Sequence, residues 1–201
     1  HCFMPDVVCG TSAGVTFGVN LLSQQRGRVL RYNCRFAGDK RYISLHSWLT
    51  TGNMINRDFA YDLLPGELDP FDENTFEQSQ AEFYATITNM RTGQAEYVRI
   101  TNTWQQMDVI RASASLPIIC QPVEWQGEKY LDGGLVDNIP LDKCIELGCD
   151  KIIIVLTRPI DYVRNDHIAG VCRLFYPRHK ALLHAIEQRN NNYNARVQPI
   201  L

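Results

Sequence analysis

The 201-residue chain has no apolar run that approaches the length needed to cross a bilayer, roughly 18 to 20 residues. It also has no basic excess, because its formal net charge is −2. A surface that binds nucleic acid normally carries a surplus of Lys and Arg, so the composition argues against a nucleic-acid partner. The chain does not begin with the basic and apolar segments of a signal peptide.

A cysteine framework is missing as well. The seven cysteines are odd in number, and their spacing matches neither a disulfide scaffold nor a metal site. Several lie in apolar surroundings, such as Cys9 after Val7 and Val8, where a reduced thiol behaves as a small hydrophobic side chain. We therefore expect reduced structural cysteines, a cytoplasmic location and no metal or cofactor.

The proportions of apolar and charged residues, 45% and 21%, are those of a soluble globular protein. Residues 1–201 are enough for one ordinary domain with a buried core. Apolar strand-like runs alternate with segments of helical spacing. This alternation predicts an α/β fold, in the form of a three-layer sandwich with a mainly parallel central sheet.

The same patterns predict where the elements lie. Strands are expected at residues 5–9, 82–88, 95–101, 121–125, 128–131 and 151–156. The last run is continuously apolar, as a strand buried on both faces should be. Helices are expected at residues 15–22, most of 42–64, 103–113 (with Thr103 as N-cap), 140–147 and 178–194, and an irregular Arg-rich surface segment at 24–40.

A serine turn follows the first expected strand. The run Gly10-Thr11-Ser12-Ala13-Gly14 fits the G-x-S-x-G pattern and precedes an expected helix. The chemistry needs a glycine two residues on either side, because a bulky side chain would clash where the turn pushes the hydroxyl outwards. The helix N-terminus also favours developing negative charge. We interpret Ser12 as a nucleophile, although a plain glycine-rich turn fits the letters too.

A carboxylate in a second glycine motif is the candidate base. Asp132-Gly133-Gly134 follows an expected strand. By itself the Asp-Gly pair is equally typical of a hairpin turn. Because no histidine lies in a recognisable catalytic context, Asp132 is the natural partner for Ser12.

Three motifs follow one another along the chain, and an apolar run at residues 151–156 comes after them. The motifs are Gly10-Thr11-Ser12-Ala13-Gly14, Ala112-Ser113-Ala114-Ser115-Leu116-Pro117 and Tyr130-Leu131-Asp132-Gly133-Gly134-Leu135. In this order they resemble the patatin-like phospholipase family, especially its bacterial members, over about residues 5–160. Within the second motif, we expect Ser113 and Ser115 to have structural roles.

The resemblance implies a lipid acyl hydrolase of the phospholipase A or lysophospholipase type. Ser12 and Asp132 would form a dyad without histidine and act through an acyl-enzyme on a lipid or other ester. The family also places a glycine-rich oxyanion loop upstream of the serine. Only eleven residues precede Ser12 and none forms such a loop, and the family usually continues beyond the point where this tail stops, so we expect the chain to be truncated at both ends. Loss of one oxyanion donor typically costs about 100-fold or more in rate.

Two other functions fit parts of the sequence. Ser12, Asp132 and His167 have the chain order of an α/β-hydrolase triad, while His179 and His184 lie in the polar tail, where a solvated helix face explains them. His167 is equally well placed to begin a helix. The absence of the glycine-rich loop instead favours a lipid-binding or interaction module without catalysis.

A cluster of cations leaves the question of a membrane open. It could face phospholipid headgroups in a peripheral contact with a membrane surface. A solvated loop that is balanced by acidic residues elsewhere explains the pattern as well. The cluster comprises Arg26, Arg28, Arg31, Arg35, Lys40 and Arg41.

Overall fold

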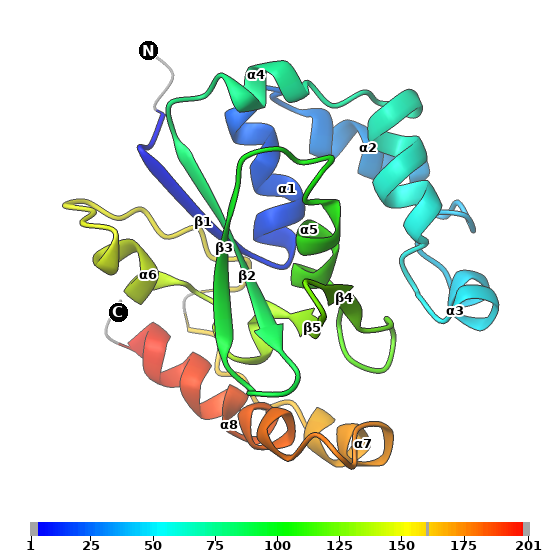
Figure 1. Ribbon diagram of the computed structural model, residues 1–201, viewed down its shortest axis with the longest axis vertical. Helices are drawn as coiled ribbons and strands as arrows, with labels where there is room; N and C mark the ends of the chain where they lie inside the picture. The colour runs from blue at the N-terminus through cyan, green and yellow to red at the C-terminus, as the bar shows by residue number, and fades with distance from the viewer. Residues whose placement is uncertain (1–3, 160, 199–201) are drawn as a thin grey trace.

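The computed structural model describes residues 4–159 and 161–198, and helices flank a central sheet within them (Figure 1). The sheet has five strands in the order β1-β2-β5-β4, with β3 paired to β2. The expected α/β fold is confirmed. The strands are β1 Val7–Thr11, β2 Glu82–Asn89, β3 Ala95–Ile100, β4 Val123–Trp125 and β5 Glu128–Asp132.

The helices follow the chain around this sheet. They are α1 Ala13–Leu22, α2 Arg28–Phe36, α3 Leu45–Thr51, the π-helix η1 Asp58–Leu68, α4 Glu73–Glu77, α5 Met107–Ser113, the 3₁₀-helix η2 Gly133–Leu135, α6 Leu141–Glu146, α7 Ile168–Phe175 and α8 Lys180–Val197.

Two apolar cores lie on opposite faces of the sheet. On one face α1 and α5 cover β2, and Val15 and Val109 pack with Phe83 and Ile87. On the other face α7 and α8 form a core with Leu131 of β5. Neighbouring residues of β5 point to opposite faces, so Tyr130 belongs to the first core and Leu131 to the second. Helices therefore pack against both faces of the sheet through these two cores.

The ends of β1 and β5 meet on one edge of β2. β1 runs parallel to β2 and ends with Thr11 opposite Thr86, whereas β5 runs antiparallel and ends with Asp132 opposite Ile87. β3 pairs along residues 83–88 and therefore occupies the other edge. The register thus places the residue after β1 next to the last residue of β5.

Several expected elements differ from the structure. The apolar run at 151–156 is not a strand: it has no regular secondary structure and no paired strand, and Ile153 and Val155 are exposed. An apolar run becomes a strand only where another strand pairs with it, and no described strand does so here. Among the strands that the structure describes, β1 and β2 pair in parallel, and the other three pairings are antiparallel.

The Arg-rich segment 24–40 is also more regular than expected, because α2 lies within it. Tyr32 and Phe36, four residues apart on one helix face, pack into a third apolar cluster. The expected helix over 42–64 is split by Gly52, and its second part, η1, runs on through Pro65. The helix expected from residue 103 begins only at Met107.

A buried ion pair fixes α2 against the end of η1. The Arg28 guanidinium is buried and donates to Asn20 Oδ1 at 2.9 Å and to the backbone oxygen of Asp69 at 3.0 Å. The Asp69 carboxylate lies 3.4 Å from Arg28 Nε and accepts two hydrogen bonds of 2.8 Å from Arg31. Two segments far apart in the chain are joined in this way.

We expect Asp69→Ala to lower the free energy of unfolding by about 3 kcal/mol, since it leaves the Arg28 charge buried without its counter-ion. The matched control is Asp39→Ala, which removes the exposed pair with Arg41 and should cost less than about 1 kcal/mol. Urea unfolding measures both values. Equal losses in the two variants would contradict this account of α2.

Candidate active site

Ser12 lies on a strained turn between β1 and α1. Its φ of 56° and ψ of −117° are rare for a residue with a side chain, and it is the N-cap residue of α1. The turn is tight, because a Cβ added to Gly10 would lie 2.5 Å from the backbone oxygen of Gly14. At Gly14 itself an added Cβ would meet nothing within 4 Å. The prediction that a side chain would clash is thus confirmed at Gly10 and wrong at Gly14.

The turn is supported by a buried serine from α5. The N–H of Ser12 donates to Ser113 Oγ at 2.9 Å, and Ser113 Oγ donates to the Thr86 backbone oxygen at 2.7 Å. Ser113 therefore links the serine turn to β2. The Ser115 hydroxyl has a more local role, because it donates back to Arg111 O in the last turn of α5, whereas the Ser115 backbone oxygen accepts the N–H of Asp132 at 2.8 Å. The neighbouring Thr11 hydroxyl donates to Asp137 O at 3.1 Å.

The structure brings Ser12 and Asp132 into direct contact, although 120 positions separate them in the chain. Ser12 Oγ donates to Asp132 Oδ2 at 2.6 Å. The other carboxylate oxygen, Oδ1, accepts the N–H of Gly134 at 2.7 Å. A Cβ on Gly133 would lie 2.2 Å from the backbone oxygen of Thr86, so this turn needs glycine where it passes β2. Both carboxylate oxygens are thus held in place.

Burial dominates the electrostatics of this carboxylate. Only 1% of Asp132 is exposed, and this desolvation raises its pKa from 3.8 to about 6. The hydrogen bonds from Ser12 and Gly134 and the charges of Arg189 and Arg164 act in the opposite direction. The folded protein keeps this proton between pH 3.8 and about 6, where the unfolded chain has released it. The resulting stabilisation is present at low pH and is lost as the pH rises to about 6.

Arg189 is a site residue that the sequence analysis missed. It lies on α8, is buried, and its Nε donates to the backbone oxygen of Gly134 at 2.9 Å. Its Nη1 also lies 3.1 Å from Asp166. The sequence could have indicated Arg189 by its position in the helical spacing of apolar residues. The inward face of α8 is otherwise apolar, and an arginine on such a face needs a buried partner. That face comprises Leu182, Ile186, Arg189, Tyr193 and Val197.

Histidine does not take part in the Ser12–Asp132 contact. In a triad an imidazole lies between the serine and the acid, whereas here the hydroxyl donates directly to the carboxylate. His167 is the N-cap residue of α7, as the helix-start interpretation expected, and it makes no hydrogen bond to either residue. Within residues 4–159 and 161–198, no three His, Cys, Asp or Glu side chains are grouped as metal ligands.

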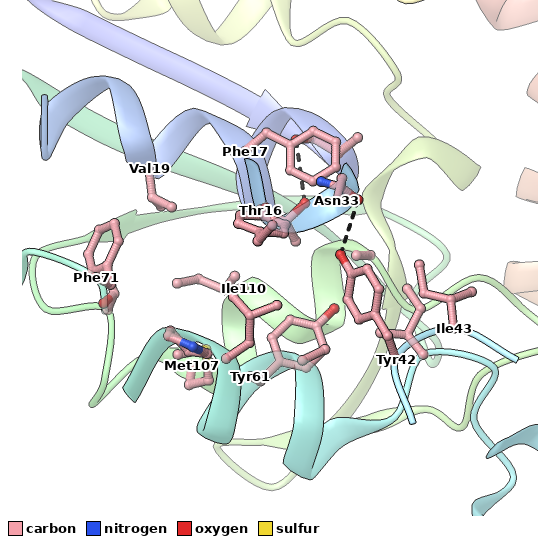
Figure 2. Close-up of a pocket in the computed structure, with 18 of the residues that line it drawn as sticks. Thr16, Phe17, Val19, Asn33, Tyr42, Ile43, Tyr61, Phe71, Met107 and Ile110 are labelled. Atoms are coloured by element: carbon pink, nitrogen blue, oxygen red, sulfur yellow. Dashed lines mark hydrogen bonds between the residues drawn. The ribbon is translucent and has the colours of Figure 1, made fainter. Parts of the chain in front are cut away.

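An apolar cavity of about 230 Å³ opens beside Ser12, between α1, η1 and α5 (Figure 2). Val19 and Phe71 lie towards one end, and Tyr42 and Ile43 lie towards the other. Its walls are mainly hydrocarbon and aromatic, so a lipid chain could replace water there at little cost. Ser12 therefore lies at the wall of a hydrophobic chamber.

Comparison with known proteins agrees with these features. The profile described as patatin-like phospholipase matches residues 1–145. The chain belongs to the patatin-like phospholipase family. It is 32% identical over 181 residues to a lysophospholipase nte1 of Aspergillus niger. The aligned region covers 82% of this chain and 11% of that protein. A lysophospholipase nte1 of Aspergillus fumigatus is 30% identical over 85% of this chain and 11% of its own length. Lysophospholipase NTE1 of Saccharomyces cerevisiae is 30% identical over 75% of this chain and 9% of its own length.

The patatin-like chain thus spans about a tenth of the length of these curated relatives. Family membership supports a hydrolase of lipid esters. The likeness to bacterial members, the upstream glycine-rich loop and the catalytic roles of Ser12 and Asp132 stay predictions. Of the helices in the described part of the chain, none combines the length and apolar character of a membrane span.

We expect Ser113→Ala to lower ester hydrolysis by about 10- to 100-fold, because the Ser12 N–H loses its acceptor and the turn loses its register. Ser115→Ala is the matched control, since its hydroxyl bonds only within its own segment. A positioning role predicts a fall in kcat with little change in KM. Equal effects of the two substitutions, or unchanged kcat in Ser113→Ala, would contradict it.

Proposed function

We propose that this domain hydrolyses acyl esters of lipids, as a phospholipase A or lysophospholipase, with Ser12 as nucleophile and Asp132 as base. The proposal rests above all on the 2.6 Å hydrogen bond from the Ser12 hydroxyl to a carboxylate that is almost wholly buried. The apolar cavity beside this pair suits a fatty acyl chain.

In the first step, Ser12 Oγ attacks the ester carbonyl carbon as its proton passes to Asp132. The proton then goes to the departing alcohol oxygen, and an acyl-enzyme remains. A water molecule then gives a proton to Asp132 as its oxygen attacks the carbonyl carbon of the acyl-enzyme. The bond between Ser12 Oγ and the acyl carbon breaks, the proton passes from Asp132 to Ser12 Oγ, and the fatty acid leaves. With a pKa of about 6, Asp132 is ionised at neutral pH and binds a proton more readily than an exposed carboxylate.

The turn also supplies a place for the negative charge of the tetrahedral intermediate. Ser12 precedes α1, and the N–H groups at the start of a helix have no acceptor within it. Val15 and Thr16 donate to the backbone oxygen of Ser12, whereas the N–H groups of Ala13 and Gly14 have no acceptor among the described residues. These donors and the helix dipole favour an oxyanion beside Ser12 Oγ. The glycine-rich loop expected from the family would add further donors, so its presence is expected to raise the rate.

Esters suit this pair better than amides do. An ester's alcohol can leave as an alkoxide before it is protonated. The nitrogen of an amide must be protonated before the C–N bond breaks, and a dyad that shares one proton is poorly suited to that. Among lipid esters, the matches to fungal lysophospholipases favour a substrate with one acyl chain. We therefore expect lysophosphatidylcholine to be hydrolysed faster than a diacyl phospholipid.

The test compares three variants on lysophosphatidylcholine and a soluble p-nitrophenyl ester. Ser12→Ala and Asp132→Asn should each lower kcat by about 1,000-fold or more, because each removes a group that acts in the transition state. His167→Ala, the matched control, should stay within about twofold of the parent. Loss of activity in His167→Ala would instead favour the triad mechanism.

Labelling by a fluorophosphonate separates the enzyme from a lipid-binding module, because only an activated serine reacts. We expect labelling of the parent protein and none of Ser12→Ala. A folded parent protein that stays unlabelled would overturn the hydrolase proposal.

A further inference from the structure

A projecting helix exposes leucines on one face. In Figure 1, α3 lies at the margin of the molecule, away from the sheet. Leu45 and Leu49 are 61% and 72% exposed, and they are four residues apart, so they share one side of the helix. Ile43, two residues before Leu45, is 46% exposed. Large apolar side chains grouped in this way mark a surface that contacts something other than water.

The helix itself is firmly held, so this exposure is built into the fold. Ser44 caps α3 by accepting the N–H of Ser47 at 2.9 Å, and Gly52 ends it in a left-handed conformation. Ser47, on the side of α3 opposite the two leucines, is buried. Trp48 Nε1 donates to the backbone oxygen of Ile118 at 3.1 Å and ties α3 to the body of the protein. The face with Leu45 and Leu49 therefore points outwards while Ser47 and Trp48 anchor the helix.

The segment that carries α3 has a surplus of cations, although the whole chain is slightly acidic. Residues 24–57 contain seven Lys and Arg and one acidic residue, and Asp58 follows directly. Arg28, Arg31 and Arg41 already have carboxylate partners. An isolated β-bridge joins Ile43 to Ile55 on the two sides of α3, and Lys40 and Arg57 lie just outside it in the chain. Both are exposed and have no salt-bridge partner in the described ranges, so two free cations flank the segment with the apolar face.

The same surface reaches the cavity beside Ser12. Ile43 is exposed at the surface and also lines that cavity, next to Tyr42 (Figure 2). An acyl chain that passes Ile43 therefore moves from the apolar face of α3 to the wall where Ser12 lies. This continuity connects the exposed leucines with the proposed chemistry.

We propose that Ile43, Leu45 and Leu49, bordered by Lys40 and Arg57, form a docking surface for an anionic phospholipid bilayer. The leucines enter the headgroup region and the cations face lipid phosphates. A second copy of the chain fits this surface poorly, because it would bring like charges together. The proposed binding to a bilayer is independent of the proposed hydrolase activity. Only the delivery of substrate from this surface to Ser12 rests on the proposed function.

Sedimentation with large unilamellar vesicles tests the proposal, with Ser12→Ala as the background so that the lipid stays intact. The vesicles are phosphatidylcholine alone, or phosphatidylcholine with 30 mol% phosphatidylglycerol, a composition chosen to carry about the negative charge of an acidic leaflet. Leu45→Ser with Leu49→Ser should weaken binding to the anionic vesicles by about 10-fold or more. The matched control is Leu174→Ser, which changes a leucine that is 79% exposed on α7.

Lys40→Gln with Arg57→Gln should weaken binding to the anionic vesicles by about 10-fold and leave binding to phosphatidylcholine vesicles unchanged. Circular dichroism and thermal unfolding check that each variant folds. Equal weakening by Leu174→Ser, or vesicle binding that no variant alters, would overturn the proposal. So would a dimer in size-exclusion chromatography that Leu45→Ser with Leu49→Ser dissociates. Because Ser12 is absent throughout, failure here is distinct from an unreactive serine in the parent protein.

Discussion

A carboxylate almost wholly withdrawn from water accepts a hydrogen bond directly from a serine hydroxyl, and the rest of the site is arranged around this contact. Oδ2 of Asp132 receives the Ser12 hydroxyl at 2.6 Å, and Oδ1 receives the N–H of Gly134 at 2.7 Å. The contact exists because β1 and β5 end beside each other on one edge of β2. A shift of either strand by one residue would turn its last side chains to the opposite face.

This arrangement carries a cost in stability. Desolvation of Asp132 is only partly offset by its hydrogen bonds and by the nearby arginines, so its pKa stays near 6. The backbone strain at Ser12 adds to the cost. Buried contacts elsewhere compensate, among them the Ser113 link to β2 and the hydrogen bond of Arg189 to Gly134. The contact between Ser12 and Asp132 is thus maintained by the well-packed structure around it.

Local patterns predicted much of this molecule. The serine turn, the hairpin of β4 and β5 and the final helix follow from short-range signals of periodicity and turn chemistry. The motifs led us to expect Ser12 and Asp132 to be partners. The distance between the hydroxyl and the carboxylate depends on strand register, which no single segment encodes. The same limit explains the run at 151–156, whose strand character requires a neighbour, and Arg189, whose partner lies 55 positions away.

The central claim is that Asp132 is a desolvated carboxylate that binds the Ser12 hydroxyl directly. Titration of the Asp132 carboxyl carbon by ¹³C NMR, assigned by comparison with Asp132→Asn, tests it most directly. We expect a pKa of about 6 for Asp132 in the parent protein and a higher pKa in Ser12→Ala, because the hydroxyl stabilises the ionised form. A pKa near that of an exposed aspartate, unchanged by Ser12→Ala, would contradict it.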